Sequence, residues 1–246
     1  MKNYNKYFNV FCLSSFFVIL LSSNYLLAQS NFEKFRKYKD RYKVECAGEK
    51  ITDNHGNGFD SLYGTRNMRT ILYGVAYRGG ANNFYHKINK RDNHNPLPED
   101  GLMNLCGQGF STAVYLYGTN FSESKKLFVN KATNDTLRYI QNSGSERKKL
   151  KEIMLIIKDV IDDPQKGPVY LHCWNGWHQS GYISAAILIQ FCKISNEQAL
   201  QYWIYNTDGV NKGYDNVKQL VKNFKPFVDL KIDESVRKAI CPCMKK

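Results

Sequence analysis

Beyond residue 28 the sequence contains no further hydrophobic span, no internal repeat and no low-complexity tract. These absences exclude a protein with several membrane spans, a solenoid of stacked repeats and a largely disordered chain. Residues 29–246 are instead long enough for one domain with a hydrophobic core of ordinary size. We therefore expect a single domain over this range.

Acidic residues are scarce: the chain has 22 Asp and Glu against 35 Lys and Arg, and a formal net charge of +13. A basic protein attracts anions such as phosphoesters, nucleic acid or acidic glycans. The basic residues are nevertheless spread along the chain, and the cluster from Arg147 to Lys151 resembles a solvated helix face. We therefore expect a phosphorylated or other anionic small molecule or protein as partner, and no nucleic acid.

No acidic residue precedes Glu33, and Lys2 and Lys6 give the chain a basic start. An apolar run follows and ends at the small residue Ala28, which suits cleavage. The pattern predicts a signal peptide over residues 1–28, and hence a secreted or periplasmic protein without a membrane span after cleavage. The alternative is an uncleaved anchor, but several serines make the run polar for a membrane span.

Six cysteines follow residue 28: Cys46, Cys106, Cys173, Cys192, Cys241 and Cys243. An exported protein can form disulfides, but the pairing cannot be read from sequence. A bridge between Cys46 and the Cys241-Pro242-Cys243 segment is one possibility. Cys192 ends an apolar helical run and is expected in the core. The Cys-Pro-Cys segment lacks a second ligand pair, so we predict no metal and no cofactor.

The stretch around Cys173 combines a strand, a tight turn and a helix. Val169 to Leu171 is β-rich and leads into His172 and Cys173, and Ser180-Gly181 opens an apolar run that is long enough for a buried helix. Backbone N–H groups converge in such a loop, and the positive end of the following helix points at the same place. The pattern therefore predicts an anion site that holds Cys173 as a thiolate.

This stretch, HCWNGWHQSG, resembles the signature H-C-x-x-G-x-x-R-S/T-G of the cysteine-dependent protein tyrosine and dual-specificity phosphatases, with nine of ten positions allowed. The departure is Gln179, which stands where the family has arginine. The resemblance implies an α/β fold with a mainly parallel central sheet flanked by helices. It also implies a hydrolase that cleaves a phosphoester through a phosphocysteine, and the predicted signal peptide makes this a secreted enzyme.

Carried onto this chain, the family mechanism makes Cys173 the nucleophile, while His172 orients the loop and Ser180 assists departure of the thiolate. The resemblance assigns phosphate binding to Trp174, Asn175, Gly176, Trp177, His178, Gln179 and Gly181. Gln179 lacks the charge and the paired donors of an arginine. Trp174 and Trp177 either stack on a ligand or pack the loop against the sheet.

The general acid of the family is expected between the predicted strand over residues 136–141 and the predicted helix over residues 143–163, but residues 141–145 hold no carboxylate. Glu146 and His178 are the candidates for this acid. One alternative function is a catalytically weak or inactive pseudophosphatase that binds a phosphorylated or anionic ligand. Another is sulfur transfer, as in rhodanese-type enzymes. The loops over residues 81–99 and 118–135 match no pattern that names a substrate.

Apolar periodicity predicts strands over residues 71–77, 112–117, 136–141 and 169–173, and helices over 32–41, 100–106, 143–163, 182–191, 199–205 and 214–224. Ser143 with Glu146, and Ser195 with Gln198, have the spacing of capping boxes. The alternation favours a mainly parallel sheet, with Cys173 at the carboxyl end of a strand.

Two segments outside that stretch contain residues with open roles. Arg78 follows the strand over residues 71–77 and either contacts the site or forms an ion pair. Asp53, Asn57 and Asp60 are predicted to form a polar turn, because their spacing fits no calcium-binding loop.

Overall fold

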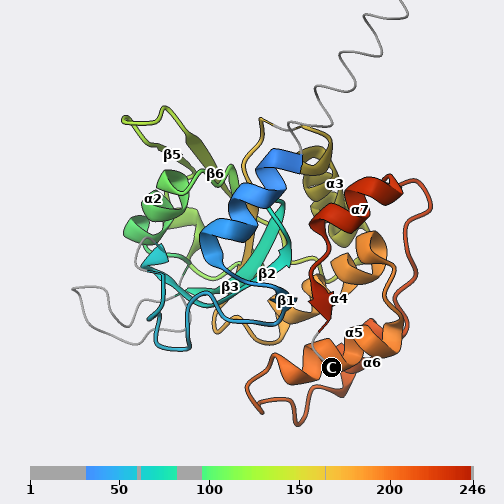
Figure 1. The fold of residues 1–246 in the computed structure, drawn as a ribbon. Helices are drawn as coiled ribbons and strands as arrows, with labels where there is room; N and C mark the ends of the chain where they lie inside the picture. Colours follow the sequence, from blue (N-terminus) through green and yellow to red (C-terminus); the bar gives the residue numbers. More distant parts are fainter. Residues whose placement is uncertain (1–31, 60–61, 82–95, 164, 245–246) are drawn as a thin grey trace, which may run out of the picture.

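The structure, a computed structural model, describes residues 32–59, 62–81, 96–163 and 165–244. Its centre is a six-stranded sheet with the order β2-β3-β7-β4-β6-β5 (Figure 1). The four inner strands are parallel: β3 (Ala76–Ala81), β7 (Val169–Cys173), β4 (Thr112–Tyr115) and β6 (Thr136–Gln141). At one edge β2 (Thr65–Leu72) pairs antiparallel with β3, and at the other edge β5 (Leu127–Val129) pairs antiparallel with β6. The predicted mainly parallel α/β architecture is confirmed.

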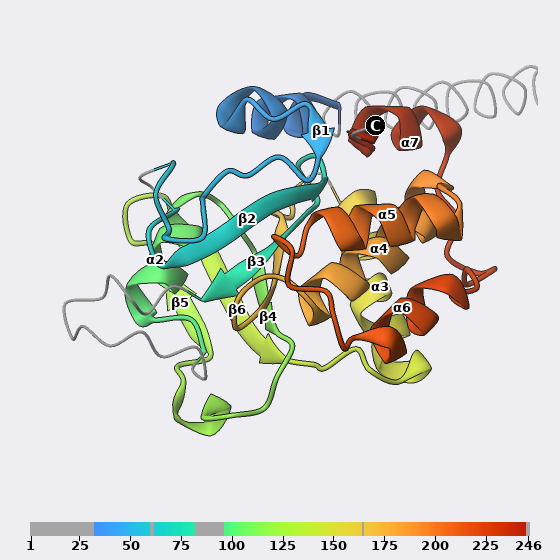
Figure 2. The same ribbon diagram turned by 90° about the horizontal axis from the view of Figure 1, so that it is seen from below.

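Helices cover both faces of the sheet (Figures 1 and 2). One face packs on α3 (Arg147–Asp162) and α4 (Gln179–Cys192), and α5 (Asn196–Tyr205) and α6 (Asp215–Lys222) pack on α4. The other face packs on the helix over residues 32–42 and on α2 (Glu99–Gly107). The remaining elements are the short helices η2 (Phe121–Glu123) and α7 (Glu234–Ile240), and a parallel pair of β1 (Cys46–Ala47) with β8 (Cys243–Met244).

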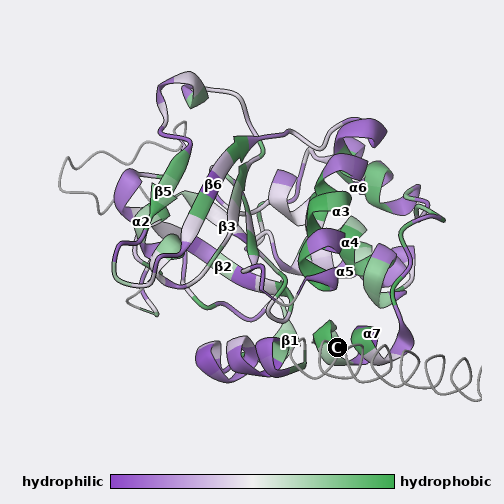
Figure 3. Ribbon diagram, turned by 90° about the horizontal axis from the view of Figure 1, so that it is seen from above, coloured by the Kyte–Doolittle hydropathy of each residue, from purple (hydrophilic) through white to green (hydrophobic). Residues whose placement is uncertain are grey.

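Strand β7 lies between β3 and β4 and feeds both hydrophobic cores, because side chains alternate across a sheet. Val169, Leu171 and Cys173 belong to the core under α3 and α4, whereas Tyr170 belongs to the core on the other face. Helix α4 is apolar almost all round, as its colour in Figure 3 shows, and every residue after Gln179 is buried. The sheet and the outer helices thus hold α4 from both sides.

Two local predictions are wrong for identifiable reasons. The predicted strand over residues 71–77 is the turn region of a hairpin, in which β2 ends at Leu72 and β3 begins at Ala76. Ser143 and Glu146 form no capping box, because Glu146 is itself the N-cap residue of α3 and no side chain caps it. Gly144, with φ of +60°, turns the chain away just before the helix begins. Strand β5 was not predicted.

The cysteines form two disulfides, Cys46–Cys243 and Cys192–Cys241. The possible bridge from Cys46 to the Cys-Pro-Cys segment is confirmed. The expectation that Cys192 lies in the core is confirmed, and the structure adds that it is bonded to Cys241. The second capping box is confirmed: the Ser195 hydroxyl accepts from the Gln198 backbone N–H at 3.1 Å.

The predicted signal peptide over residues 1–28, most of the loop over residues 81–99, and Asp60 lie outside the described residues. Within the described ranges, no helix combines the length and apolar character needed to cross a membrane.

Candidate functional site

Cys173 is the last residue of β7, and the backbone then forms a short loop before α4 begins at Gln179; residues 173–179 are called the cysteine loop. The Cys173 side chain is 4% exposed, and its Sγ lies 3.4 Å from the hydroxyl of Ser180 in the first turn of α4. The N-cap residue, His178, provides no side-chain cap. The N–H groups of the first helical turn therefore face the loop without a side-chain acceptor, which is the arrangement that binds anions.

Glycines let the cysteine loop lie directly on β3. Gly176 has φ of +76°, and a Cβ there would stand 2.6 Å from the carbonyl carbon of Gly79. A Cβ on Gly80 would stand 2.5 Å from the carbonyl oxygen of Trp174. The backbone N–H of Ala81 donates to that same oxygen at 3.0 Å. The end of β3 thus fixes the loop backbone at a distance that only glycine permits.

Asn67 of β2 supports the loop from a second strand. Its side-chain amide donates to the carbonyl oxygen of Asn175 at 2.8 Å and to the side chain of Asn54 at 2.9 Å. Asn67 is fully buried and has φ of +50°. Nothing in the sequence marks it as part of the site, because a left-handed asparagine inside a strand has no signature in residue pattern.

His172 is fully buried beside the cysteine loop and stacks on Tyr115, Tyr139 and Tyr170. Its Nδ1 lies 3.3 Å from the carbonyl oxygen of Cys173, so Nδ1 carries the proton, and Nε2 accepts from the Tyr139 hydroxyl at 2.9 Å. Burial lowers the pKa of His172 to about 3, against the smaller opposing effect of its bond to the Cys173 carbonyl. A neutral His172 therefore orients the strand end rather than transferring protons.

Arg78 of β3 contacts the site and forms no ion pair with any described residue. Its side chain is fully buried and donates to the carbonyl oxygens of Gly176 and Trp177. The structure therefore decides between the two roles that the sequence left open for Arg78. The nearby Asp208 carboxylate instead pairs with Arg69 at 3.2 Å.

The two tryptophans of the cysteine loop pack against the protein. The Trp174 indole N–H donates to the Tyr115 hydroxyl at 3.0 Å, and its ring stacks on Tyr117 with centroids 4.6 Å apart. The Trp177 indole N–H donates to Asp208 at 3.1 Å. Both indole donors are thus used within the molecule, which favours the packing role of these residues.

His178 and Glu146, the two candidate acids, differ in their surroundings. His178 stacks on Tyr214 with centroids 3.6 Å apart, and its Nε2 donates to the carbonyl oxygen of Val210 at 2.6 Å. The pKa of His178 is lowered, chiefly by burial, so protonation of its ring is disfavoured. Glu146 is exposed at the start of α3. Neither geometry marks a general acid held against Cys173.

The side-chain amide of Gln179 bonds to a residue outside the cysteine loop. Its Nε2 donates to the carbonyl oxygen of Ser143 at 2.5 Å, in the connection between β6 and α3. Gln179 therefore ties this connection to the first turn of α4.

The described residues contain no group of three or more His, Cys, Asp or Glu placed to hold a metal ion. The Asp53 carboxylate accepts from the backbone N–H groups of His55 at 2.7 Å and Asn57 at 2.9 Å, which is the geometry of a polar turn.

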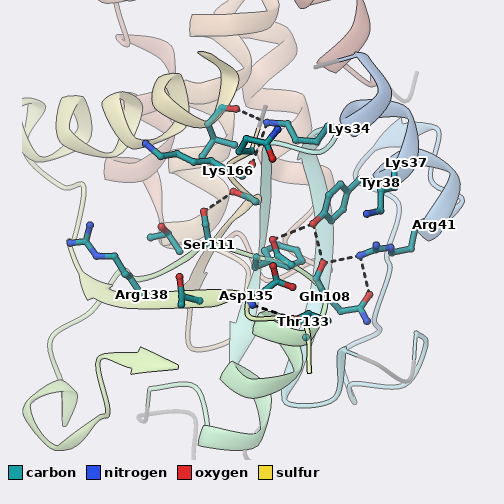
Figure 4. A pocket seen from close by; sticks show the side chains of 18 of the residues that line it. Lys34, Lys37, Tyr38, Arg41, Gln108, Ser111, Thr133, Asp135, Arg138 and Lys166 are labelled. Atoms are coloured by element: carbon teal, nitrogen blue, oxygen red, sulfur yellow. Dashed lines mark hydrogen bonds between the residues drawn. The ribbon is translucent and has the colours of Figure 1, made fainter. Parts of the chain in front are cut away.

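A hollow opens at the other end of the sheet, where the parallel strands begin. It measures about 1230 Å³ and is lined by side chains of both charges, including Lys34, Asp135 and Lys166 (Figure 4). The Lys34 ammonium donates to three carbonyl oxygens in the last turn of α3 and just after it, the nearest being that of Val160 at 2.7 Å. None of the predicted site residues lines this hollow.

No protein-family model and no curated protein matches the sequence. Among solved structures, the core catalytic domain of the PP-IP phosphatase Siw14 from S. cerevisiae is 12% identical, with a TM-score of 0.44 over 72% of this chain and 92% of that chain. TpbA from P. aeruginosa is 16% identical, with a TM-score of 0.41 over 69% and 90%. PTP-2 phosphatase from Cydia pomonella is 16% identical, with a TM-score of 0.39 over 64% and 91%. These identities and TM-scores describe a distant similarity of backbone structure and support no conclusion about activity.

Proposed function

We propose that this protein hydrolyses a phosphoester of a small molecule or protein through a phosphocysteine on Cys173. The observation that carries the proposal is the position of the thiol at the end of β7. Its Sγ lies 3.4 Å from the Ser180 hydroxyl and beside a helix start without a side-chain cap. An oxyanion in the loop meets N–H donors and the positive end of the α4 dipole, and the nucleophile stands beneath it.

In this mechanism the Cys173 thiolate attacks phosphorus, a P–S bond forms and the P–O bond to the alcohol breaks. An alcohol that is a poor leaving group needs a proton on its departing oxygen, and solvent supplies this proton. Water then attacks the phosphocysteine, releasing phosphate and the thiolate, and the Ser180 hydroxyl donates to the sulfur as its charge returns. His172 holds the strand end through the Cys173 carbonyl.

A second candidate function is anion binding without turnover. It is favoured by Gln179, which brings no charge and donates to Ser143 instead of the loop interior. It is also favoured by residues 141–145, which hold no carboxylate. Loss of one preorganised donor slows comparable reactions roughly 10²–10³-fold. In this case the ligand is phosphorylated or otherwise anionic, and the protein is a pseudophosphatase.

Hydrolysis of a small aryl phosphate separates the two candidates, because its good leaving group needs little acid assistance. Wild type is expected to release phosphate slowly, Cys173→Ser to release none, and Gln179→Arg to be faster. Cys106→Ser is the matched control, since Cys106 is the other free, buried thiol of the described chain. Activity that survives Cys173→Ser would exclude the nucleophile. Stabilisation by tungstate or vanadate without phosphate release would select the pseudophosphatase.

We also propose that the protein acts outside the cytoplasm, after cleavage near Ala28. The two disulfides support this, because such bonds persist in oxidising compartments. Intact-mass measurement of protein recovered from its native host tests the proposal. A mass that includes residues 1–28 would contradict it.

A further inference from the structure

Arg78 is a buried cation with no carboxylate partner among the described residues. Its side chain is fully buried, and its guanidinium donates only to uncharged oxygens: the carbonyls of Gly176 and Trp177 and the hydroxyl of Tyr202 at 3.3 Å. Its Nε has no partner in the described structure. Because arginine stays charged in proteins, this charge is held inside the molecule without a fixed counter-ion.

Of the groups beside Arg78, the start of α4 adds to the positive potential, whereas the charge of Arg69 is already balanced. Arg69 stands directly opposite on β2, and its own charge is paired with Asp208. A Cβ on Gly181, in the first turn of α4, would lie 3.5 Å from an Arg78 nitrogen. The positive end of the helix dipole and the guanidinium therefore meet under the cysteine loop.

The contacts of Arg78 also set the direction of two loop amides. The peptide bonds from Gly176 to Trp177 and from Trp177 to His178 are trans. In a trans peptide the N–H points in the opposite direction to the carbonyl of the same peptide bond. Since the Gly176 and Trp177 carbonyls point at Arg78, the N–H groups of Trp177 and His178 point to the other side. Arg78 thus orients two donors away from itself, at the level of the first turn of α4.

We propose that Arg78 is the charge partner of the anion held by the cysteine loop, acting from beneath the backbone and replacing the charge that Gln179 does not supply. The proposal rests on the proposed anion site but not on turnover. Arg78 is a positioning residue: it touches the loop carbonyls, and its charge reaches the bound oxyanion and the Cys173 thiolate through the oriented peptides. The charge of Arg78 is balanced when Cys173 is a thiolate or when an oxyanion is bound in the cysteine loop.

Tungstate affinity, measured by calorimetry on the full mature domain, tests this without requiring hydrolysis. Arg78→Gln retains a donor but removes the charge, and is expected to weaken tungstate binding roughly tenfold to a hundredfold. Arg78→Lys retains the charge and is expected to stay within about threefold of wild type. Adding Gln179→Arg to Arg78→Gln is expected to restore most of the lost affinity, because the charge returns on the other side of the loop.

The control is Arg69→Gln, which removes an equally buried guanidinium that already has Asp208 as its partner. It is expected to lower the melting temperature but to change tungstate affinity by less than about threefold. Equal losses in Arg78→Lys and Arg78→Gln, or no rescue by Gln179→Arg, would show that Arg78 only supports the loop and would overturn the proposal.

If Arg78→Gln does not fold, Arg78→Lys decides alone, and a more than tenfold loss there counts against the charge role. Wild type that binds tungstate but releases no phosphate refutes the proposed hydrolysis and leaves the role of Arg78 intact. Wild type that binds no oxyanion refutes both.

Discussion

The two ends of the central sheet differ in how they are built. Where the parallel strands begin, a hollow of about 1230 Å³ is open to solvent and lined by charges of both signs (Figure 4). Where β7 ends, Cys173 is 4% exposed under a loop that rests on β3. The first end offers space, whereas the second brings a buried thiol, a hydroxyl and a helix start together. The proposed anion site therefore does not coincide with this hollow.

The disulfides belong to the end where the strands begin, so removing them should separate stability from binding. The Ile240 carbonyl accepts from Tyr73, in the turn before β3, and Cys241 and Cys243 follow directly. Replacing all four bridged cysteines by serine is expected to cost about 2–5 kcal/mol of unfolding free energy for each bridge. Denaturant unfolding measures this loss.

Tungstate binding well below the melting temperature should then stay close to that of wild type, because the bridged segment contacts the turn before β3, at the opposite end of that strand from the cysteine loop. A fall in affinity that parallels the fall in stability would show that the two ends are coupled.

The end where β7 stops should tolerate little change in its backbone. Gly176→Ala places a Cβ 2.6 Å from the backbone of Gly79 at a positive φ, and is expected to cost about 2–5 kcal/mol and most oxyanion binding. Gly213→Ala is the matched control, since Gly213 has φ of +78° and nothing within 4 Å of its Cβ position. That variant should lose only the strain of its left-handed backbone, about 1–2 kcal/mol. Similar losses in the two variants would contradict the close contact with β3.

His172 should make the strand end sensitive to acid. Its pKa is lowered to about 3 in the folded protein, from 6.5 for an ordinary histidine. Between these values the unfolded chain binds a proton that the folded protein does not, so the contribution to stability is full above pH 6.5 and is lost as the pH falls toward 3. Denaturant midpoints of wild type across this range should therefore fall more steeply than those of His172→Gln. Parallel curves would show that His172 is protonated in the fold.

Changes at the open end should have the smallest effects. Lys166 pairs with Asp159 on the surface at 2.5 Å, and such pairs contribute little. Lys166→Ala is expected to change stability by less than about 1 kcal/mol and to leave phosphate release unchanged. A loss of phosphate release in Lys166→Ala would move the search for the site to this hollow.

The sequence predicted the cysteine loop well because its elements are local. Val169 to Cys173, the turn and the apolar helix follow one another, and each has a periodic or turn signature. Strand β6 (Thr136–Gln141) and the Ser195 capping box were equally local. Short-range patterns therefore placed Cys173 at the end of a parallel strand and Ser180 in the first turn of the following helix.

What the sequence could not predict depends on contacts between distant segments. The hairpin of β2 and β3 was missed because Ile71 to Tyr77 is apolar apart from Gly74, and this single glycine, with φ of +64°, is the only mark of the turn. The support of the cysteine loop by Asn67, and the partner of Gln179 at Ser143, join residues 108 and 36 positions apart. Only the folded chain brings these groups together.

The Cys46–Cys243 bridge also makes a closed covalent ring of everything between those residues, 197 positions apart along the chain. Cys192 and Cys241 close a smaller ring inside it. A single proteolytic cut in the exposed segment around Gly209, or in any other surface turn of the ring, would release no fragment until the bridges are reduced. Likewise, a pulling force applied at the two bridged residues would pass through sulfur and leave the sheet, and the cysteine loop on it, unloaded.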